Sequence, residues 1–256
     1  MKRPPVPHEN GRYGAQTVRS TADTMGSMAG RPKALVSWSS GKDSAFALHV
    51  VRQSADVEIV GLVTTIATQL GCVAMHGVRE ALLDAQAEAL HLKCWKVPIP
   101  WPCSNAVYER EMSRVLRSAQ AEGITQLVLG DLFLADLRAY REAQFAEMGI
   151  QGVFPLWMRD TGQLAREMLD SGLRATLTCI DPKKLSASFA GRTFDSALLA
   201  DLPPDVDPCG ENGEFHTFAF AGPMFQQPIA FVVGQTIERD GFVFADVLPM
   251  SESMPQ

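Results

Sequence analysis

A run of small, hydroxylic and charged residues, SSGKDS at positions 39–44, follows a short apolar segment that ends at Trp38. A helix that begins within such a run presents free backbone N–H groups and the positive end of its dipole, and both attract an anion. Small side chains let the backbone approach a phosphate closely, the hydroxyls add donors, and the lysine adds a cation. The sequence therefore predicts a phosphate-binding loop made of Ser39, Ser40, Gly41, Lys42, Asp43 and Ser44.

This loop lacks the Walker A pattern, which requires glycine where Val36 stands and serine or threonine where Asp43 stands. Within the loop, Lys42 and Asp43 are the catalytic candidates. Asp43 is also the expected Mg²⁺ ligand, because Mg²⁺ in nucleotide sites is held by one or two carboxylates together with phosphate oxygens. The alternative interpretation is a serine-rich helix cap followed by a surface lysine.

A second group of reactive side chains lies in the segment GENGEFH at positions 210–216. Asn212-Gly213 predicts a turn, from which Glu211 and Glu214 project, and His216 enters a strand. Acids beside a nucleotide can hold Mg²⁺, orient ammonia or accept a proton from an attacking amine, so both glutamates are expected to be catalytic. Two alternatives stay open: a solvated acidic turn, and a metal site that uses both glutamates and the histidine.

Single polar residues near the ends of predicted strands extend the nucleotide site. His76, at the expected start of a helix, and Gly130-Asp131, directly after an apolar segment, are assigned to the nucleotide. Arg138 and Arg141 lie on the next expected helix. Either arginine can clamp a phosphate, or both can lie on a solvated helix face.

Apolar segments alternate with helical segments through the first part of the chain, and this alternation predicts a parallel sheet. The expected strands are 34–38, 57–66, 94–99, 126–129 and one beginning at 153, with helices at 43–52, 76–90, 105–121 and 136–148. The strands are apolar throughout, which is typical of a sheet covered on both faces. We therefore predict an α/β fold, with a Rossmann-like doubly wound parallel sheet in an ATP-binding domain at 31–155.

The pattern changes after residue 155. Short helices at 163–171 and 194–199, a strand at 174–180, and a hairpin with its turn at Asp240-Gly241 predict a smaller C-terminal α+β domain. This substrate-binding domain is expected to span 156–250. Residues 1–30 are rich in Pro, Gly, Ser and Thr without an apolar period, so they are expected to form a disordered tail.

Composition limits the functional class. The 256 residues are 46% hydrophobic and 20% charged, as in globular proteins. A net charge of −6 argues against a nucleic-acid partner. Five cysteines without a CxxC pair favour a reducing, cytoplasmic environment, and no apolar run is long enough to span a membrane. We expect a soluble protein with no membrane partner, and a homodimer stays open.

The two motifs resemble those of a known family. The 39–44 loop is similar to the SGGKDS loop of the PP-loop ATP pyrophosphatases, with Ser40 in place of a glycine. A negative φ at Ser40 would accommodate that change. GENGEFHTF at 210–218 with GPMF at 222–225 resembles the GEGGEFET…PLF signature of diphthine–ammonia ligases. Gly130, Arg138 and Glu142 match a further segment of that family, and His76 falls where the family has a histidine.

The resemblance implies an ATP-dependent, AMP-forming amide ligase that adenylates a carboxylate and then aminates it with ammonia or another amine. It implies ATP and Mg²⁺ as cofactors and a small-molecule or protein carboxylate as substrate. The substrate-binding residues would be Arg138, Glu142, Gly210, Glu211, Asn212, Gly213, Glu214 and His216. His216, Asn212 and Asp131 depart from the family pattern and indicate a bacterial-type branch with an open substrate. Two alternatives are another adenylating PP-loop enzyme, such as a tRNA-modifying one, and a non-catalytic adenine-nucleotide-binding module.

Overall fold

The computed structural model describes residues 30–250. From Arg31 onward the described residues form one compact unit. The predicted tail, apart from Gly30, lies outside the described residues. The predicted division into domains at 155/156 stays a prediction. No helix in the described part of the chain is long and apolar enough to cross a membrane.

The five main strands of the first sheet are parallel, as the alternation of strands and helices predicts. Its hydrogen-bonded order is β4-β2-β1-β5-β6, and the two-residue strand β3 pairs antiparallel with the far end of β2. The strands are β1 (Lys33–Ser37), β2 (Glu58–Ala67), β3 (Cys72–Val73), β4 (Lys93–Ile99), β5 (Ile124–Val128) and β6 (Gln151–Val153). The order changes direction at β1, so the carboxyl ends of β1 and β5 are the expected place for a ligand.

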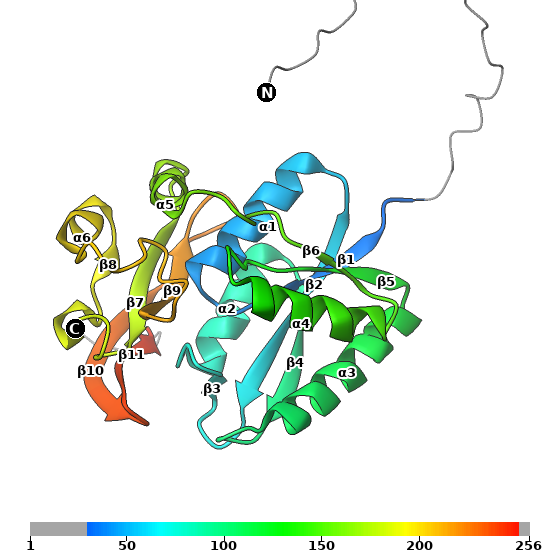
Figure 1. The fold of residues 1–256 in the computed structure, drawn as a ribbon, viewed down its shortest axis with the longest axis horizontal. Coiled ribbons are helices and arrows are strands. Elements are labelled where there is room, and N and C mark those ends of the chain that lie inside the picture. Colours follow the sequence, from blue (N-terminus) through cyan, green and yellow to red (C-terminus); the bar gives the residue numbers. More distant parts are fainter. Residues whose placement is uncertain (1–29, 251–256) are drawn as a thin grey trace, which may run out of the picture. The chain divides into compact units, whose positions relative to one another are not determined.

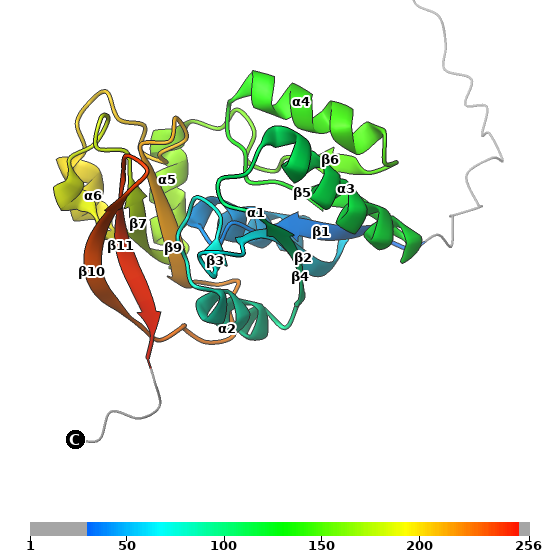
Figure 2. The same cartoon turned by 90° about the horizontal axis from the view of Figure 1, so that it is seen from below.

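Helices cover both faces of this sheet (Figures 1 and 2). They are α1 (Lys42–Ser54), α2 (Glu80–Leu90), α3 (Asn105–Ala121) and α4 (Ala135–Ala146). Ala34 and Val36 of β1 belong to the apolar cluster under α1 and α2, whereas Leu35 between them belongs to the cluster under α3 and α4. Alternate residues of a strand point to opposite faces, so a fully apolar strand is the sequence mark of this arrangement.

The second sheet is antiparallel and is built around β7 (Arg174–Ile180). This strand pairs with β9 (Phe215–Ala221) on one side, and with β8 (Thr193–Phe194) and β11 (Phe242–Pro249) on the other. β10 (Phe231–Arg239) completes the predicted hairpin with β11. The turn residues Asp240 and Gly241 have φ of 53° and 82°, as a tight hairpin requires.

Short helices complete this C-terminal part: α5 (Thr161–Asp170), the 3₁₀ turn Ala187–Phe189 and α6 (Ser196–Asp201). The apolar cluster under α1 and α2 continues without a break into residues of α5, β7 and β9. The two sheets therefore share one core, which fixes β9 against the beginning of α1.

Two expected helices start too early. The helix predicted at 194–199 begins at Ser196, and Phe194 belongs to β8. The helix predicted at 76–90 begins only at Glu80, and His76 lies in the loop between β3 and α2. Met75 and Gly77 in this loop have positive φ, with values of 64° and 68°, so the chain turns there instead of continuing a helix. His76 therefore reaches its position from a loop.

Candidate active site

The predicted phosphate loop lies between β1 and the first turn of α1, at the carboxyl end of the parallel sheet. Gly41 caps α1 without a side-chain hydrogen bond to the helix. The Ser44 hydroxyl donates to the Gly41 carbonyl oxygen at 3.0 Å and lies 3.2 Å from the Ser39 hydroxyl. A Cβ on Gly41 would come within 2.9 Å of the His76 ring, so glycine is required for this close contact.

Ser40 adopts a left-handed backbone conformation, with φ of 68°, so serine occupies the glycine position without the negative φ that would accommodate it. Its carbonyl oxygen accepts hydrogen bonds from the Ala219 N–H at 2.8 Å and from Gln86 Nε2 at 3.0 Å. Its buried hydroxyl has no hydrogen-bond partner among the described residues. The two bonds from α2 and β9 hold a conformation that otherwise favours glycine.

Gln86 joins the phosphate loop to both halves of the structure. It is fully buried on α2, where it accepts from Trp38 Nε1 at 2.9 Å and donates to Ala219 O as well as to Ser40 O. Replacing it with leucine leaves the buried Trp38 N–H without an acceptor. We expect Gln86→Leu to lower the free energy of unfolding by about 2–3 kcal/mol.

Urea unfolding of the wild type and the variant measures this effect. The control is Gln53→Leu on the exposed side of α1, which should change stability by no more than about 0.5 kcal/mol. Equal losses in the two variants would contradict the role given to Gln86.

The Lys42 amine is buried and is held by groups of the protein itself. Its amine donates to both carboxylate oxygens of Asp43 at 3.0 Å, and to the Cys209 carbonyl oxygen. It lies 5.5 Å from the ring centre of Phe194 and 5.2 Å from that of Phe215, and it is almost completely buried. Burial by itself would lower the pKa of Lys42, but the Asp43 carboxylate raises it above its ordinary value. The lysine therefore stays charged inside the protein and fixes the 207–210 segment to the loop.

A pocket of about 320 Å³ opens beside the loop and combines residues of both sheets. Its lining comprises Ser37, Ser39, Asp43, Ser44, His76, Gly130, Asp131, Leu134, Leu137, Arg141, Gly210, Glu211, Phe215, His216 and Thr217. Most of the predicted nucleotide-binding residues are thus brought together. Ser40, Gly41 and Lys42 are not among the described lining residues, and Ser40 and Lys42 are buried.

The two predicted catalytic glutamates occupy different environments. Glu211 lines the pocket and accepts a hydrogen bond from the Leu132 N–H at 2.8 Å. Burial raises its pKa to about 7, and the carboxylates of Asp43 and Asp131 contribute to this rise. Glu214 is not among the described lining residues. It is buried, and it accepts hydrogen bonds at 3.1 Å from the Asp207 N–H and from Asn212 Nδ2.

His76 and His216 meet at the wall of the pocket, although one follows β3 and the other lies on β9. Their ring centres are 4.6 Å apart, and His76 Nδ1 lies 3.2 Å from the Thr217 carbonyl oxygen. The Thr217 hydroxyl accepts the Lys42 backbone N–H at 3.0 Å. β9 therefore contacts the phosphate loop and the histidine loop at once.

The arginine that reaches the pocket is Arg141. Its guanidinium donates to Asp131 at 2.6 Å, and both residues line the pocket. Arg138 pairs instead with Glu142 at 2.8 Å and lies over the rings of Phe154 and Trp157, about 4.5 Å from each ring centre. The structure therefore does not bring the predicted substrate-binding residues Arg138 and Glu142 to the pocket. Asn212 and Gly213 are likewise absent from its described lining.

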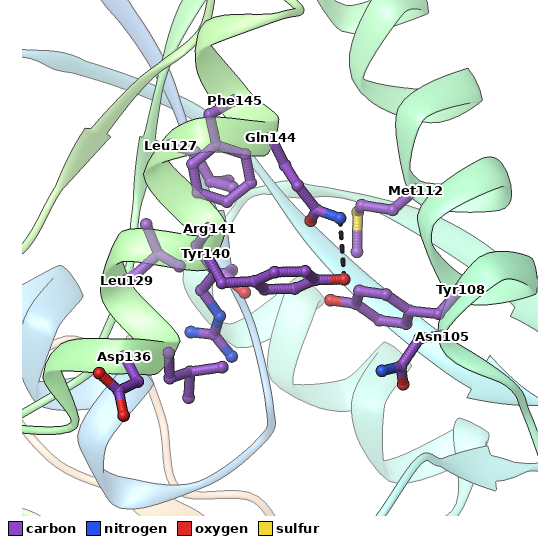
Figure 3. Close-up of a pocket in the computed structure, with 12 residues that line it drawn as sticks. Asn105, Tyr108, Met112, Leu127, Leu129, Asp136, Tyr140, Arg141, Gln144 and Phe145 are labelled. Carbon is purple, nitrogen blue, oxygen red and sulfur yellow. Dashed lines mark hydrogen bonds between the residues drawn. The ribbon is translucent and has the colours of Figure 1, made fainter.

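A larger, mostly apolar cavity of about 580 Å³ adjoins this pocket between α3 and α4 (Figure 3). Ser37, Leu137 and Arg141 line both spaces. Its other lining residues are Asn105, Tyr108, Met112, Leu127, Leu129, Asp136, Tyr140, Gln144 and Phe145. Gln144 Nε2 donates to the Tyr140 hydroxyl at 2.9 Å, and that hydroxyl donates to Glu109. This cavity offers an apolar space with polar groups at one side, as small-ligand sites do.

The pocket carboxylates fit Mg²⁺ only together with a phosphate. Among the residues that the structure describes, no group of three metal-ligating side chains is close enough to hold an ion alone. Asp43, Asp131 and Glu211 nevertheless line one pocket, and Mg²⁺ in nucleotide sites takes one or two carboxylates plus phosphate oxygens. Asp43 is therefore the residue suited to hold it, together with phosphate oxygens, whereas the raised pKa of Glu211 makes that carboxyl group a poorer ligand.

The site contains residues that sequence reasoning missed, chiefly Gln86, Thr217 and the tyrosines of the apolar cavity. Gln86 offered a signal, since it is a polar residue next to Ala87 and within one turn of Leu82 and Leu83 in the apolar stripe of a helix. Thr217 and the tyrosines offered none, because their roles depend on which distant segments pack together.

Comparison with known proteins gives a consistent result. The model of the diphthamide synthase N-terminal domain matches residues 32–152, and that of the diphthamide synthase C-terminal domain matches residues 160–244. A diphthine–ammonia ligase of Danio rerio is 28% identical over 234 residues, which cover 82% of this chain and 90% of that protein.

Two further relatives match over shorter stretches. A diphthine–ammonia ligase of Schizosaccharomyces pombe is 27% identical over 96 residues, which cover 36% of this chain and 16% of that protein. The Homo sapiens protein of the same name is 29% identical over 109 residues, which cover 39% of each chain. These two alignments span well under two thirds of the relatives' lengths.

Proposed function

The chain belongs to the diphthamide synthase family, and on this premise we propose that it joins a substrate carboxylate to ammonia through an acyl-adenylate. Membership of this family makes it an ATP-dependent ligase. The relatives are named for diphthine and ammonia. For this chain the proposal commits to ammonia as the amine, and to a carboxylate that enters the pocket lined by Glu211.

One observation carries the proposal: the phosphate loop and a carboxyl group with a pKa of about 7 line the same pocket. Ser39 and Ser44 of the loop line this pocket, and Glu211 from the C-terminal part of the chain lines it as well. A general base is most effective when its pKa lies near the working pH. Anion binding and proton transfer can therefore take place within one small space.

In the first step, a carboxylate oxygen attacks the α phosphorus of ATP, and the bond to the pyrophosphate oxygen breaks. The N–H groups at the start of α1 and the Ser39 and Ser44 hydroxyls face the charge that develops on the leaving pyrophosphate. Mg²⁺ held by Asp43 would neutralise part of this charge. The adenosine is proposed to occupy the apolar cavity, which reaches the pocket past Leu137 and Arg141.

In the second step, ammonia attacks the acyl carbon, and AMP leaves. The nitrogen must lose a proton as the amide forms, and Glu211 accepts it. The Leu132 N–H bond to Glu211 Oε1 fixes the orientation of this carboxylate. The other carboxylate oxygen is then free to face the amine.

Carboxylate-dependent exchange of pyrophosphate into ATP tests the first step, and transfer of ¹⁵N from ammonium to product tests the second. Diphthine on an elongation factor and small carboxylates are the substrates to compare. Exchange together with ¹⁵N-amide supports the proposal. ATP binding without exchange would indicate a nucleotide-binding module, and exchange without ¹⁵N transfer would indicate another adenylating enzyme.

A substitution at Leu137 tests the binding place of the adenosine independently of the binding place of the phosphates. This half-buried side chain of α4 lines both the pocket and the apolar cavity. Leu137→Trp should narrow the passage between them and weaken ATP binding about tenfold or more, because a misfitting group loses apolar contacts. Inorganic pyrophosphate needs only the loop, so calorimetry should show its affinity unchanged. An equal loss for both ligands would contradict the placement of adenosine.

A further inference from the structure

The paired histidines of the pocket have a geometry that the proposed chemistry does not yet use. Their rings are in contact, with centres 4.6 Å apart, and both line the pocket beside the phosphate loop. His76 packs directly against the loop, since a Cβ on Gly41 would lie 2.9 Å from its Cε1 atom. A phosphate bound at the start of α1 therefore lies next to an imidazole.

The hydrogen bond of His76 defines its tautomer. The Thr217 carbonyl oxygen, 3.2 Å from Nδ1, can only accept, so Nδ1 carries the hydrogen. Nε2 is then the atom that can take up a proton. Burial lowers the pKa of His76 to about 4, and burial together with His76 lowers the pKa of His216 to about 3. Both rings are neutral at pH 7 in the free protein.

The charged groups around the pair leave the pocket short of positive charge. Asp43, Asp131 and Glu211 line it with carboxyl groups. Lys42 is paired with Asp43 and turned towards Cys209, and Arg141 is paired with Asp131. A triphosphate that enters this pocket adds several negative charges, which the cations already paired with carboxylates balance only in part.

We propose that His76 and His216 form a proton-coupled clamp for the triphosphate of ATP, in which the pair takes up one proton from solvent as the phosphates bind. This inference rests on the ATP binding of the proposed function. The proton adds to an imidazole nitrogen, and the imidazolium donates to a phosphate oxygen. The proton returns to solvent when pyrophosphate leaves and the ring becomes neutral again.

The direction of the coupling follows from charge. An anion within hydrogen-bond distance favours the charged form of an imidazole, and partial burial strengthens this attraction. The rings of His76 and His216 are so close that two imidazolium charges would repel each other strongly, so the pair takes up one additional proton and not two. The clamp thus supplies positive charge only while polyphosphate is present, whereas an unpaired lysine would supply it permanently.

Calorimetric titration of the full chain with Mg·ATP, in buffers of different ionisation enthalpy, measures the coupling. We expect an uptake that approaches one proton per ATP near pH 6 and declines above pH 7, and an affinity that falls up to about tenfold per pH unit as the pH rises from about 5 to 7. In His76→Gln and His216→Gln the uptake should drop below half of the wild-type value. The ionisation of ATP itself cancels in the difference between wild type and variant.

The matched control is His49→Gln, since His49 lies on α1 outside the pocket lining and should keep the wild-type uptake. A second measurement avoids variants altogether. Spectra of ¹⁵N-histidine-labelled wild-type protein should show neutral rings without ligand and one imidazolium with ATP or inorganic pyrophosphate. ATP binding with two neutral rings and no His-dependent uptake would overturn the clamp alone, whereas no ATP binding at all would overturn the proposed function with it.

Discussion

Replacing Glu211 with glutamine is expected to leave ATP binding near normal and to slow amide formation about a hundredfold or more. Glutamine keeps the size of the side chain and can still accept the Leu132 N–H, but it cannot take a proton from the attacking amine. The measurement is single-turnover formation of ¹⁵N-amide after ATP has been bound. A rate close to that of the wild type would remove Glu211 from the chemistry.

The rate of amide formation should also depend differently on pH in the wild type and in Glu211→Gln. Burial raises the pKa of Glu211 to about 7, so the group loses its proton, and becomes able to act as a base, as the pH rises through neutrality. The wild-type rate should therefore rise through this range. The fraction of ammonium that is deprotonated to ammonia also increases with pH, but this affects the rates of both proteins equally. Only the ratio of wild-type to Glu211→Gln rates isolates the carboxyl group, and this ratio should increase with pH.

Glu214→Gln is the matched control because it makes the same chemical change three residues away. Glu214 lies outside the described pocket lining, and its carboxylate accepts hydrogen bonds from Asp207 and Asn212 within its own loop. This variant should lose some stability and keep amide formation within a few-fold of the wild type. If Glu214→Gln were the variant that abolished amide formation, the roles of the two glutamates would be reversed.

The two glutamates show which features of the site the sequence can predict and which it cannot. The turn at Asn212-Gly213 predicted that both acids belong to one site, and they do lie on one loop. A spacing of three residues in an irregular turn does not fix the direction of either side chain, however. That direction depends on the N–H of Leu132, which lies 79 positions away in sequence. Long-range backbone contacts of this kind leave no local pattern.

The parallel sheet was predictable because its strands are apolar on both faces. Three of the five residues of β1 and three of the five of β5 are buried, and a helix follows each strand. The error at the start of α2 has a local cause, since Met75 and Gly77 in the loop before it have a left-handed backbone that the apolar period does not reveal. The left-handed Ser40 was missed for another reason: Gln86 and Ala219 stabilise it from other elements.

Replacing Lys42 is expected to have a large effect on the stability of the free protein. A lysine next to a phosphate loop predicts a phosphate ligand, yet its amine is buried between Asp43, Cys209 and two aromatic rings. Lys42→Met keeps the length of the side chain but leaves the Asp43 carboxylate without its partner. We expect the free energy of unfolding to fall by about 3 kcal/mol in the absence of any nucleotide, as urea unfolding would measure.

A double-mutant cycle shows whether the ion pair is the cause. Asp43→Asn alone should also destabilise the protein, because it leaves the buried ammonium of Lys42 with a neutral partner. Lys42→Met combined with Asp43→Asn removes both charges, so it should recover a coupling energy of about 1–3 kcal/mol relative to the sum of the single losses. Lys183→Met, on an exposed lysine, is the surface control and should have little effect. If Lys42 contacted only phosphate, Lys42→Met would leave the stability of the free protein unchanged and weaken pyrophosphate binding instead, and the cycle would show no coupling.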